Sequence, residues 1–151
     1  MKVPAIPPVG HVIAYQYLWA SQAATREDGA KTYPCAIVLA QETREGEPPI
    51  AYVVAISHTP PVKGRRTVSV PPKLKRHLGL DDLPSWVYVD ELNVFSWPGP
   101  DIRPGDHLPR RPAAIDNVVI GQLPSDWFEL LKQGVDAAYR QQQLSIQKRT
   151  G

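Results

Sequence analysis

Three side chains that could transfer protons stand at the ends of expected strands. His11 begins one strand, and Ser57 and His58 end another. Histidine takes up or releases a proton near neutral pH, and it is the side chain most often used as a general acid or base. We therefore consider His11 and His58 a candidate base and acid, and Ser57 a candidate site residue because it lies where a buried strand leaves the core. The alternative is that Ser57 and His58 only begin the turn Thr59–Pro61.

Two further positions could contact a substrate. Asp90 and Glu91 lie between two expected strands, where one carboxylate could orient a histidine or an arginine, although a simple charged turn is the alternative. Trp97 stands at the edge of the rigid turn Pro98–Asp101. Its ring could stack on a nucleobase or pack against a proline.

Charge is segregated along the chain, although the total is only +2. Lys63–Arg76 holds six basic residues and no acid, and Asp81–Asp101 holds five acids and no Lys or Arg. These segments are either two solvated faces or surfaces for a polyanion and for a basic partner. Under the second interpretation, Arg65 and Arg66 are candidate contacts to a polyanionic substrate.

Several kinds of site are excluded. The single cysteine, Cys35, rules out an intramolecular disulfide and a CxxC zinc site. No glycine-rich phosphate loop and no GxSxG motif occurs, which removes nucleotide kinases, dinucleotide enzymes and common hydrolases. His11, His58, Asp90 and Glu91 have no recognisable ligand spacing, so we expect no metal and no cofactor.

The elements that position these residues must be short. Proline makes up 17 of the 151 residues, about twice its usual share of roughly 5%, and it disrupts helices and central strands. The length fits one domain, residues 1–151. No apolar run is long enough for a membrane helix, and prolines interrupt the N-terminus where a signal peptide needs an apolar core. We expect a cytoplasmic protein.

The pattern of apolar residues predicts a mainly β fold, a small partly open β-barrel of about six or seven strands with a C-terminal helix. An apparent capping box, Asp126 with Glu129, begins that helix, which extends to Gln143. Its expected apolar stripe consists of Trp127, Leu130, Leu131, Gly134, Val135 and Ala138. The polar tail from about residue 145 is expected to fray. The other expected elements are strands Val9–Leu18, Pro34–Gln41, Ile50–His58, Thr67–Val70, Trp86–Val89, Val94–Trp97 and Val118–Gln122, a short helix Pro71–Leu78, a long loop Trp19–Thr32 and a crossing segment Asp101–Asn117.

Strand pairing brings several candidates together. Alternation along a strand places Lys31 and Tyr33 on one face where the second strand begins. A hairpin turn at Glu45–Glu47 should pair that strand antiparallel with the third, which ends at Ser57 and His58. We therefore expect Lys31, Tyr33, Ser57 and His58 to line one concave surface, with His11 and Asp90 nearby and the loop Trp19–Thr32 over it.

Five segments occur in a characteristic order: GHVIAYQYLW, YPCAIVLA, VVAISHTPP, PPKLKRHLGLD and SWVYVDELNVFSWPGPDIRP. Together they resemble the PemK/MazF family of toxins from bacterial toxin–antitoxin pairs, and more narrowly its PemK-like plasmid-maintenance branch. The resemblance extends over roughly Gly10–Leu131.

The resemblance implies an SH3-like barrel, usually a homodimer, that cleaves single-stranded RNA without a metal by attack of the RNA's own 2′-hydroxyl. It also implies an antitoxin protein as partner. The family's catalytic threonine matches Ser57, but its catalytic arginine matches Tyr33. Lys31 could then supply the cation and His58 the base. Two alternatives remain open, a PemK-like barrel that binds RNA or an antitoxin without cleaving, and an unrelated small β-barrel interaction module.

Overall fold

The computed structural model describes residues 2–23, 31–108 and 117–149, and it is mainly β. Over these residues it has nine strands, where the sequence predicted six or seven. The strands are β1 (His11–Tyr15), β2 (Tyr33–Gln41), β3 (Ile50–Ser57), β4 (Thr67–Ser69), β5 (Trp86–Tyr88), β6 (Glu91–Ser96), β7 (Ile102–Arg103), β8 (Val119–Gln122) and β9 (Ser145–Lys148). The helices are α1 (Pro72–His77) and α2 (Ser125–Arg140), with two 3₁₀ turns, η1 (Ala20–Gln22) and η2 (Gly105–His107).

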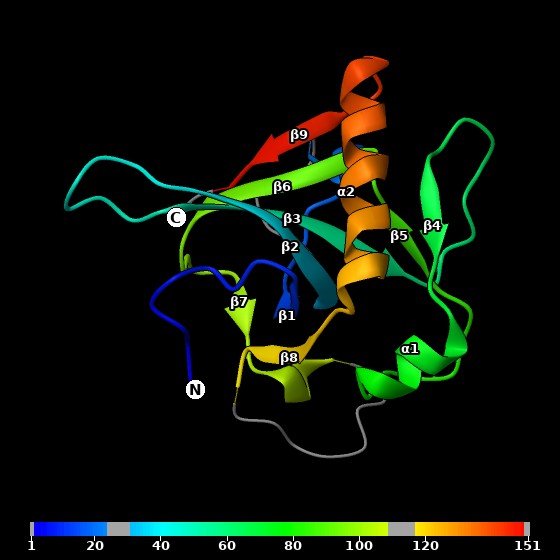
Figure 1. Ribbon diagram of the computed structural model, residues 1–151, viewed down its shortest axis with the longest axis horizontal. Coiled ribbons are helices and arrows are strands. Elements are labelled where there is room, and N and C mark those ends of the chain that lie inside the picture. The colour runs from blue at the N-terminus through cyan, green and yellow to red at the C-terminus, as the bar shows by residue number, and fades with distance from the viewer. Residues whose placement is uncertain (1, 24–30, 109–116, 150–151) are drawn as a thin grey trace.

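One strongly bent sheet contains all these strands (Figure 1). Its central path runs β4-β5-β3-β2-β1-β7, and its neighbours are antiparallel. β5 and β6 pair with different parts of the same edge of β3, and β7 and β8 share an edge of β1 in the same way. The sheet does not close on itself. The predicted fold class, a partly open β-barrel with a C-terminal helix, is confirmed.

Both faces of the central strands are buried, as their apolar sequences predict. On β2, Ala36 and Val38 join a core cluster that also contains residues of α1 and α2, whereas Cys35 and Ile37 join a second cluster on the opposite face. This division follows the two-residue period of a strand. The second cluster is rich in aromatic rings, including Tyr15, which stacks on Phe95 at 4.6 Å between ring centroids.

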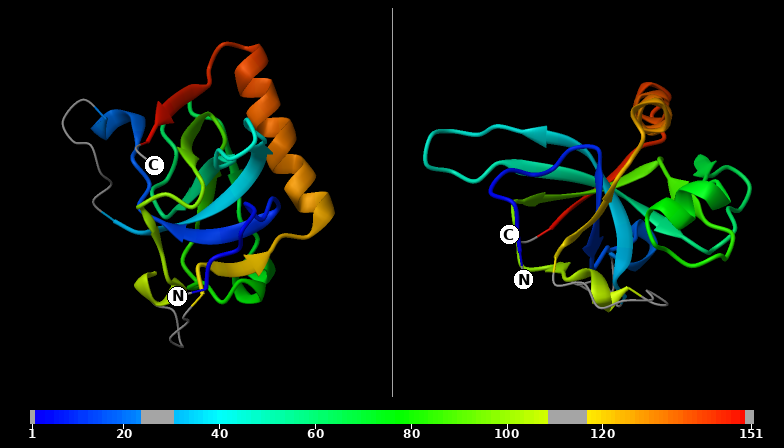
Figure 2. Two further views of the ribbon diagram at one scale, coloured as in Figure 1. Left: turned by 90° about the vertical axis from the view of Figure 1, so that its left-hand side faces the viewer. Right: turned by 60° about the horizontal axis from the view of Figure 1, so that its bottom comes forward.

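Helix α2 runs along one side of the sheet (Figures 1 and 2). Leu131 and Ala138 are its fully buried residues. Gly134 allows a close approach, because a Cβ there would lie 2.8 Å from Cγ2 of the buried Val89. The described part of the chain has no helix with the length and apolar character needed to cross a membrane.

The predicted capping box is wrong. The helix starts at Ser125 and its N-cap is Pro124, which makes no side-chain cap. Asp126 is therefore already inside the first turn, and its carboxylate accepts a hydrogen bond from the Trp127 N–H at 2.7 Å. Glu129 pairs with Lys132 instead of reaching back.

The prediction of a frayed tail is also wrong. Ser145–Lys148 forms β9, which pairs in parallel with β6. Arg149 then turns inward, and its guanidinium forms an ion pair with Asp101 at 3.0 Å. The polar tail is thus held in place by the buried guanidinium of Arg149 and by the pairing of β9 with β6.

Some predicted segments lie partly outside the described residues. These are 24–30 of the loop Trp19–Thr32, 109–116 of the segment Asp101–Asn117 and 150–151 of the tail. The expectation that the first loop closes over the site therefore rests on sequence alone.

Two adjacent leucines test the packing of α2. Both belong to the predicted apolar stripe, but Leu131 is fully buried, whereas Leu130 is 49% exposed and lies outside the core. Leu131→Ala is expected to lower the free energy of unfolding by about 2–5 kcal/mol in urea titrations, since it removes buried methyl groups and leaves a cavity. Leu130→Ala is the matched control, expected to stay within about 0.5 kcal/mol. Similar losses for both variants would contradict this packing.

Candidate functional site

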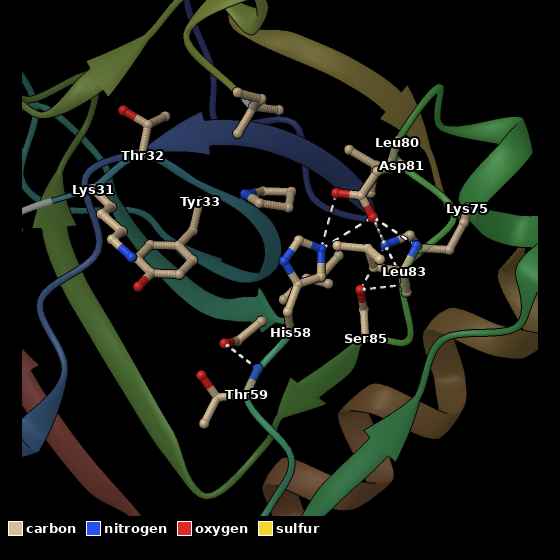
Figure 3. Close-up of a pocket in the computed structure, with 14 residues that line it drawn as sticks. Lys31, Thr32, Tyr33, His58, Thr59, Lys75, Leu80, Asp81, Leu83 and Ser85 are labelled. Carbon is tan, nitrogen blue, oxygen red and sulfur yellow. Dashed lines mark hydrogen bonds and ion pairs between the residues drawn. The ribbon is translucent and has the colours of Figure 1, made fainter. Parts of the chain in front are cut away.

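A cavity of about 260 Å³ opens where β2 begins and β3 ends. Cys35 of β2 pairs with Ala55 of β3. Tyr33, two residues before Cys35, and Ser57, two residues after Ala55, therefore come to the same edge. The residues that line the cavity include Lys31, Tyr33, Ser57 and His58, which the sequence predicted to share one concave surface, together with Thr59, Lys75, Asp81 and Ser85 (Figure 3).

His58 and Asp81 form the most directed polar pair of this cavity. The Nε2 atom of His58 lies 3.0 Å and 2.9 Å from the two carboxylate oxygens of Asp81. An ionised carboxylate only accepts hydrogen bonds, so Nε2 must carry the hydrogen. In the neutral imidazole, Nδ1 is then the atom that can accept a proton. The ring is 47% exposed, and its second nitrogen faces the side of the cavity where Tyr33 lies (Figure 3).

The chain reversal at the end of α1 brings Asp81 to this position. Gly79 has φ +67°, a left-handed conformation that glycine adopts without strain. The N–H of Leu80 bonds to the carbonyl of Lys75, and the N–H of Gly79 bonds to that of Arg76, the Schellman pattern of a helix end. The reversal brings Asp81 back against Lys75, which lies in the last turn of α1.

Lys75 is buried and keeps Asp81 ionised. Its ammonium donates to Asp81 at 2.8 Å and also to the Leu83 carbonyl and the Ser85 hydroxyl. Burial by itself raises the pKa of the Asp81 carboxyl, but hydrogen bonds from Lys75, the Leu83 N–H and His58 outweigh it, and the pKa is lowered from its ordinary value. Asp81 is therefore a carboxylate over the whole range in which histidine titrates.

The opposite wall of the cavity carries Lys31 and Tyr33 (Figure 3). The Lys31 ammonium is exposed, and its positive charge is available to an anionic ligand, unlike that of the buried Lys75. Ser57 is 6% exposed, and its hydroxyl accepts a hydrogen bond from the Thr59 N–H at 3.1 Å. That contact stabilises the turn that begins at Thr59. This is the structural role that the sequence left open as the alternative to a catalytic role for Ser57.

His11 is not part of this cavity, and the expectation that it lies nearby is wrong. β1 runs antiparallel to β2 with Tyr15 opposite Tyr33, so the C-terminal end of β1 lies beside the start of β2. His11 is four residues away along the strand, or about 13 Å at roughly 3.3 Å per residue. It pairs with Gln122 of β8 instead.

Asp90 and Glu91 form a separate cluster around Arg65. The Arg65 guanidinium contacts Asp90 at 2.7 and 2.9 Å and Glu91 at 2.9 Å, so a carboxylate here does orient an arginine. Neither Asp90 nor Glu91 lines the His58 cavity. Burial raises the pKa of the Asp90 carboxyl, but hydrogen bonds from Arg65 and the Arg66 N–H outweigh it, and the pKa is lowered. Burial raises the pKa of Glu91, and its hydrogen bonds with Ala20 N–H and Arg65 offset only part of that rise.

Two candidate substrate contacts have structural partners instead. Trp97 is 3% exposed and its indole Nε1 donates to the Pro4 carbonyl at 2.7 Å, so the prediction that this ring stacks on a base is wrong. The aromatic ring belongs to the core beside Phe95. The Arg66 guanidinium donates to Gln141 at 2.6 Å, just beyond the end of α2.

Basic side chains neutralise most of the acidic segment, and two of them, Arg65 and Lys75, belong to the basic segment. Four of the five acids in Asp81–Asp101 form ion pairs with basic residues of the same chain. These pairs are Asp81 with Lys75, Asp90 and Glu91 with Arg65, and Asp101 with Arg149. The acidic run therefore does not form an unpaired negative face, whereas Lys63, Lys73 and Arg76 of the basic run are exposed.

Asp81 and Lys75 were missed by the sequence analysis as site residues. Lys75 was counted in a basic run and Asp81 in an acidic one. The signal that could have found them is the glycine that ends the short helix, because a Schellman reversal at Gly79 returns the following residues toward the last helical turn.

The cavity can do acid–base chemistry on an anion. It presents an oriented imidazole and one exposed ammonium, with the Tyr33 and Thr59 hydroxyls as further donors. Within residues 2–23, 31–108 and 117–149, no three His, Cys, Asp or Glu side chains gather as a metal site. Compared with protein-family models, curated proteins and solved structures, the chain has no match.

Proposed function

We propose that this protein is a metal-independent endoribonuclease of the PemK/MazF type, a toxin that cleaves single-stranded RNA in the cytoplasm. The observation that carries the proposal is the His58–Asp81 pair, which faces a cavity with Lys31 on its opposite wall. The ordered segments that resemble this family support the same activity.

In the proposed reaction, the neutral Nδ1 of His58 accepts the proton of a ribose 2′-hydroxyl. The 2′-oxygen then bonds to the adjacent phosphorus, and the bond from phosphorus to the 5′-oxygen breaks. The departing 5′-oxygen takes a proton from the imidazolium or from water. The products are a 2′,3′-cyclic phosphate and a 5′-hydroxyl end. Lys31 stabilises the charge that develops on the phosphorane, and Asp81 stabilises the imidazolium.

The test is incubation of the purified protein with mixed single-stranded RNA in EDTA. We expect cleavage to persist in EDTA and to yield 2′,3′-cyclic phosphate and 5′-hydroxyl ends. DNA of the same sequence, which lacks the 2′-hydroxyl, should stay intact. Cleavage of that DNA, or cleavage that requires added magnesium, would overturn the mechanism.

A second candidate function is binding of RNA or an antitoxin without cleavage. It is favoured by one specific observation, the tyrosine at position 33 where the resemblance places a catalytic arginine. Tyrosine supplies neither a fixed charge nor a bidentate phosphate contact. Lys75 does not replace that charge, because Asp81 already neutralises it. The homodimer and the antitoxin partner remain proposals that rest on the resemblance.

Tyr33→Arg separates the two candidates. If the missing arginine limits catalysis, this variant is expected to cleave RNA faster, by up to roughly 10²-fold, the effect of one preorganised donor on the transition state. Tyr33→Phe is the matched control, since it keeps the ring that contacts Trp19 at 5.5 Å and adds no charge. Initial rates on one labelled RNA measure both. Equal rates for Tyr33→Arg and Tyr33→Phe would show that charge at this position does not limit the reaction.

Lys31→Ala tests the phosphate contact. We expect weaker binding of single-stranded RNA and a salt dependence that is shallower by about one phosphate contact, or roughly 0.7 in the slope of log K against log salt. Lys73→Ala, an exposed lysine on α1 outside the cavity, is the control. An unchanged slope in Lys31→Ala would place the phosphate elsewhere.

A further inference from the structure

A second cavity, of about 210 Å³, adjoins the one that contains His58. It is lined by Trp19, Ser21, Ser57, Thr59, Arg65 and Tyr88. Ser57 and Thr59 line both cavities, so a ligand seated on His58 could extend directly into the second one.

The walls of this second cavity are aromatic and held in place. The Trp19 ring makes edge contacts with Tyr17, Tyr33 and Tyr88, with ring centroids 4.7, 5.5 and 5.3 Å apart. Tyr88 is itself fixed by its hydroxyl, which donates to the Thr59 carbonyl at 2.6 Å. Because Tyr33 lines the first cavity, a continuous aromatic surface connects the two.

Arg65 gives this cavity a flat polar wall without a net positive charge. Its guanidinium lies 4.7 Å from the centroid of the Tyr88 ring and is clamped by Asp90 and Glu91. Two carboxylates against one guanidinium make the surroundings unfavourable for a phosphate. Among the hydrogen bonds of the described residues, those of Arg65 use Nε and Nη2, which leaves Nη1 to donate to a neutral ring. A flat neutral ring with acceptor atoms fits this chemistry better than an anion does.

We propose that the second cavity binds one unpaired nucleobase, stacked against Trp19 and the Arg65–Tyr88 wall, of the RNA strand whose phosphate lies between His58 and Lys31. The inference rests on the proposed function, which identifies the bound nucleic-acid strand as RNA. It adds that the protein recognises bases and not only the phosphate backbone, with Trp19 and Arg65 as specificity-determining residues.

The experiment compares two fluorescein-labelled octamers by anisotropy in EDTA, using His58→Ala protein so that RNA stays intact. One is an RNA octamer that contains each base twice, and the other is the same octamer with every base removed. The two octamers carry equal charge, so the difference in affinity measures the bases. We expect the abasic octamer to bind about 5- to 150-fold more weakly, the effect of losing one stacked base, and more weakly still if further bases stack.

Variants in the same background assign that difference to this cavity. Trp19→Ala should weaken binding of the intact octamer by roughly 5-fold or more and change binding of the abasic octamer less than twofold. Arg65→Lys, which keeps the charge but loses the flat group, should act in the same direction and serves if Trp19→Ala does not fold. Tyr139→Ala, an exposed aromatic on α2 that lines neither cavity, is the control and should change neither affinity.

The outcomes separate this inference from the proposed function. Equal affinity for the two octamers, or equal losses on both in Arg65→Lys, would overturn the base site even if the protein cleaves RNA. Base-dependent binding that requires Trp19 would support it even if the wild-type protein cleaves nothing. Absence of binding to either octamer would overturn both proposals.

Discussion

Replacing His58 with alanine is expected to lower the rate of RNA cleavage by roughly 10²–10⁴-fold, the usual contribution of a general acid or base. The reason is geometric. The imidazole is the acid–base group that the cavity orients, through two contacts of about 3 Å to the Asp81 carboxylate, and its other ring nitrogen faces the cavity. The measurement is the initial rate on a labelled single-stranded RNA in EDTA, with substrate well above the concentration that saturates the wild-type protein.

The control is a histidine outside the cavity. His77 lies on α1, is exposed and contacts the Gln122 carbonyl, so His77→Ala should cleave at the wild-type rate. Far-ultraviolet circular dichroism and the urea midpoint of both variants show whether either change disturbs the fold. Wild-type cleavage by both His58→Ala and Lys31→Ala would mean that the catalytic site lies elsewhere on the protein.

Replacing Arg149 with alanine should cost about 3–5 kcal/mol of unfolding free energy, because it breaks a buried ion pair by removing one of its two members. The Arg149 side chain is 1% exposed and donates to Asn93 and to the Gln16 carbonyl in addition to its ion pair with Asp101. Its guanidinium also lies 5.5 Å from the centroid of the Tyr15 ring. Four groups that are distant in sequence thus meet at this one side chain near the C-terminus.

Lys148→Ala is the matched control, since Lys148 is exposed and adjacent on β9. It should change the free energy of unfolding by less than about 0.5 kcal/mol. Urea titration followed by tryptophan fluorescence gives both values. An equal, small effect of the two substitutions would mean that the tail contributes nothing to the stability of the sheet.

Part of the candidate site could be predicted from the sequence because it depends on local rules. Alternation along a strand and one hairpin are enough to bring Lys31 and Tyr33 to Ser57 and His58, and the register of β2 and β3 confirms that arrangement. The same rules failed for His11, whose strand begins at the opposite edge. The sequence marks it as the start of a strand but does not say which end of that strand meets β2.

Other residues could not be assigned because their partners are remote. Asp81 is 23 residues from His58, and Arg149 is 48 residues from Asp101. Trp97 has the type and setting of a stacking residue, yet its indole donates to Pro4, 93 residues away, inside the core. No periodicity in the chain encodes these contacts.

The sequence by itself determined the class of fold, the central hairpin and the four residues that meet where β2 begins and β3 ends, since each follows from neighbours along the chain. Only the tertiary structure decided which charged side chains form ion pairs with one another and which stay exposed to solvent. Docking of α1 buries Lys75 and presents Asp81 to His58, while β9 carries Arg149 to Asp101. Burial makes an unpaired charge costly, so the packed fold, and not the order of residues, selects the partners.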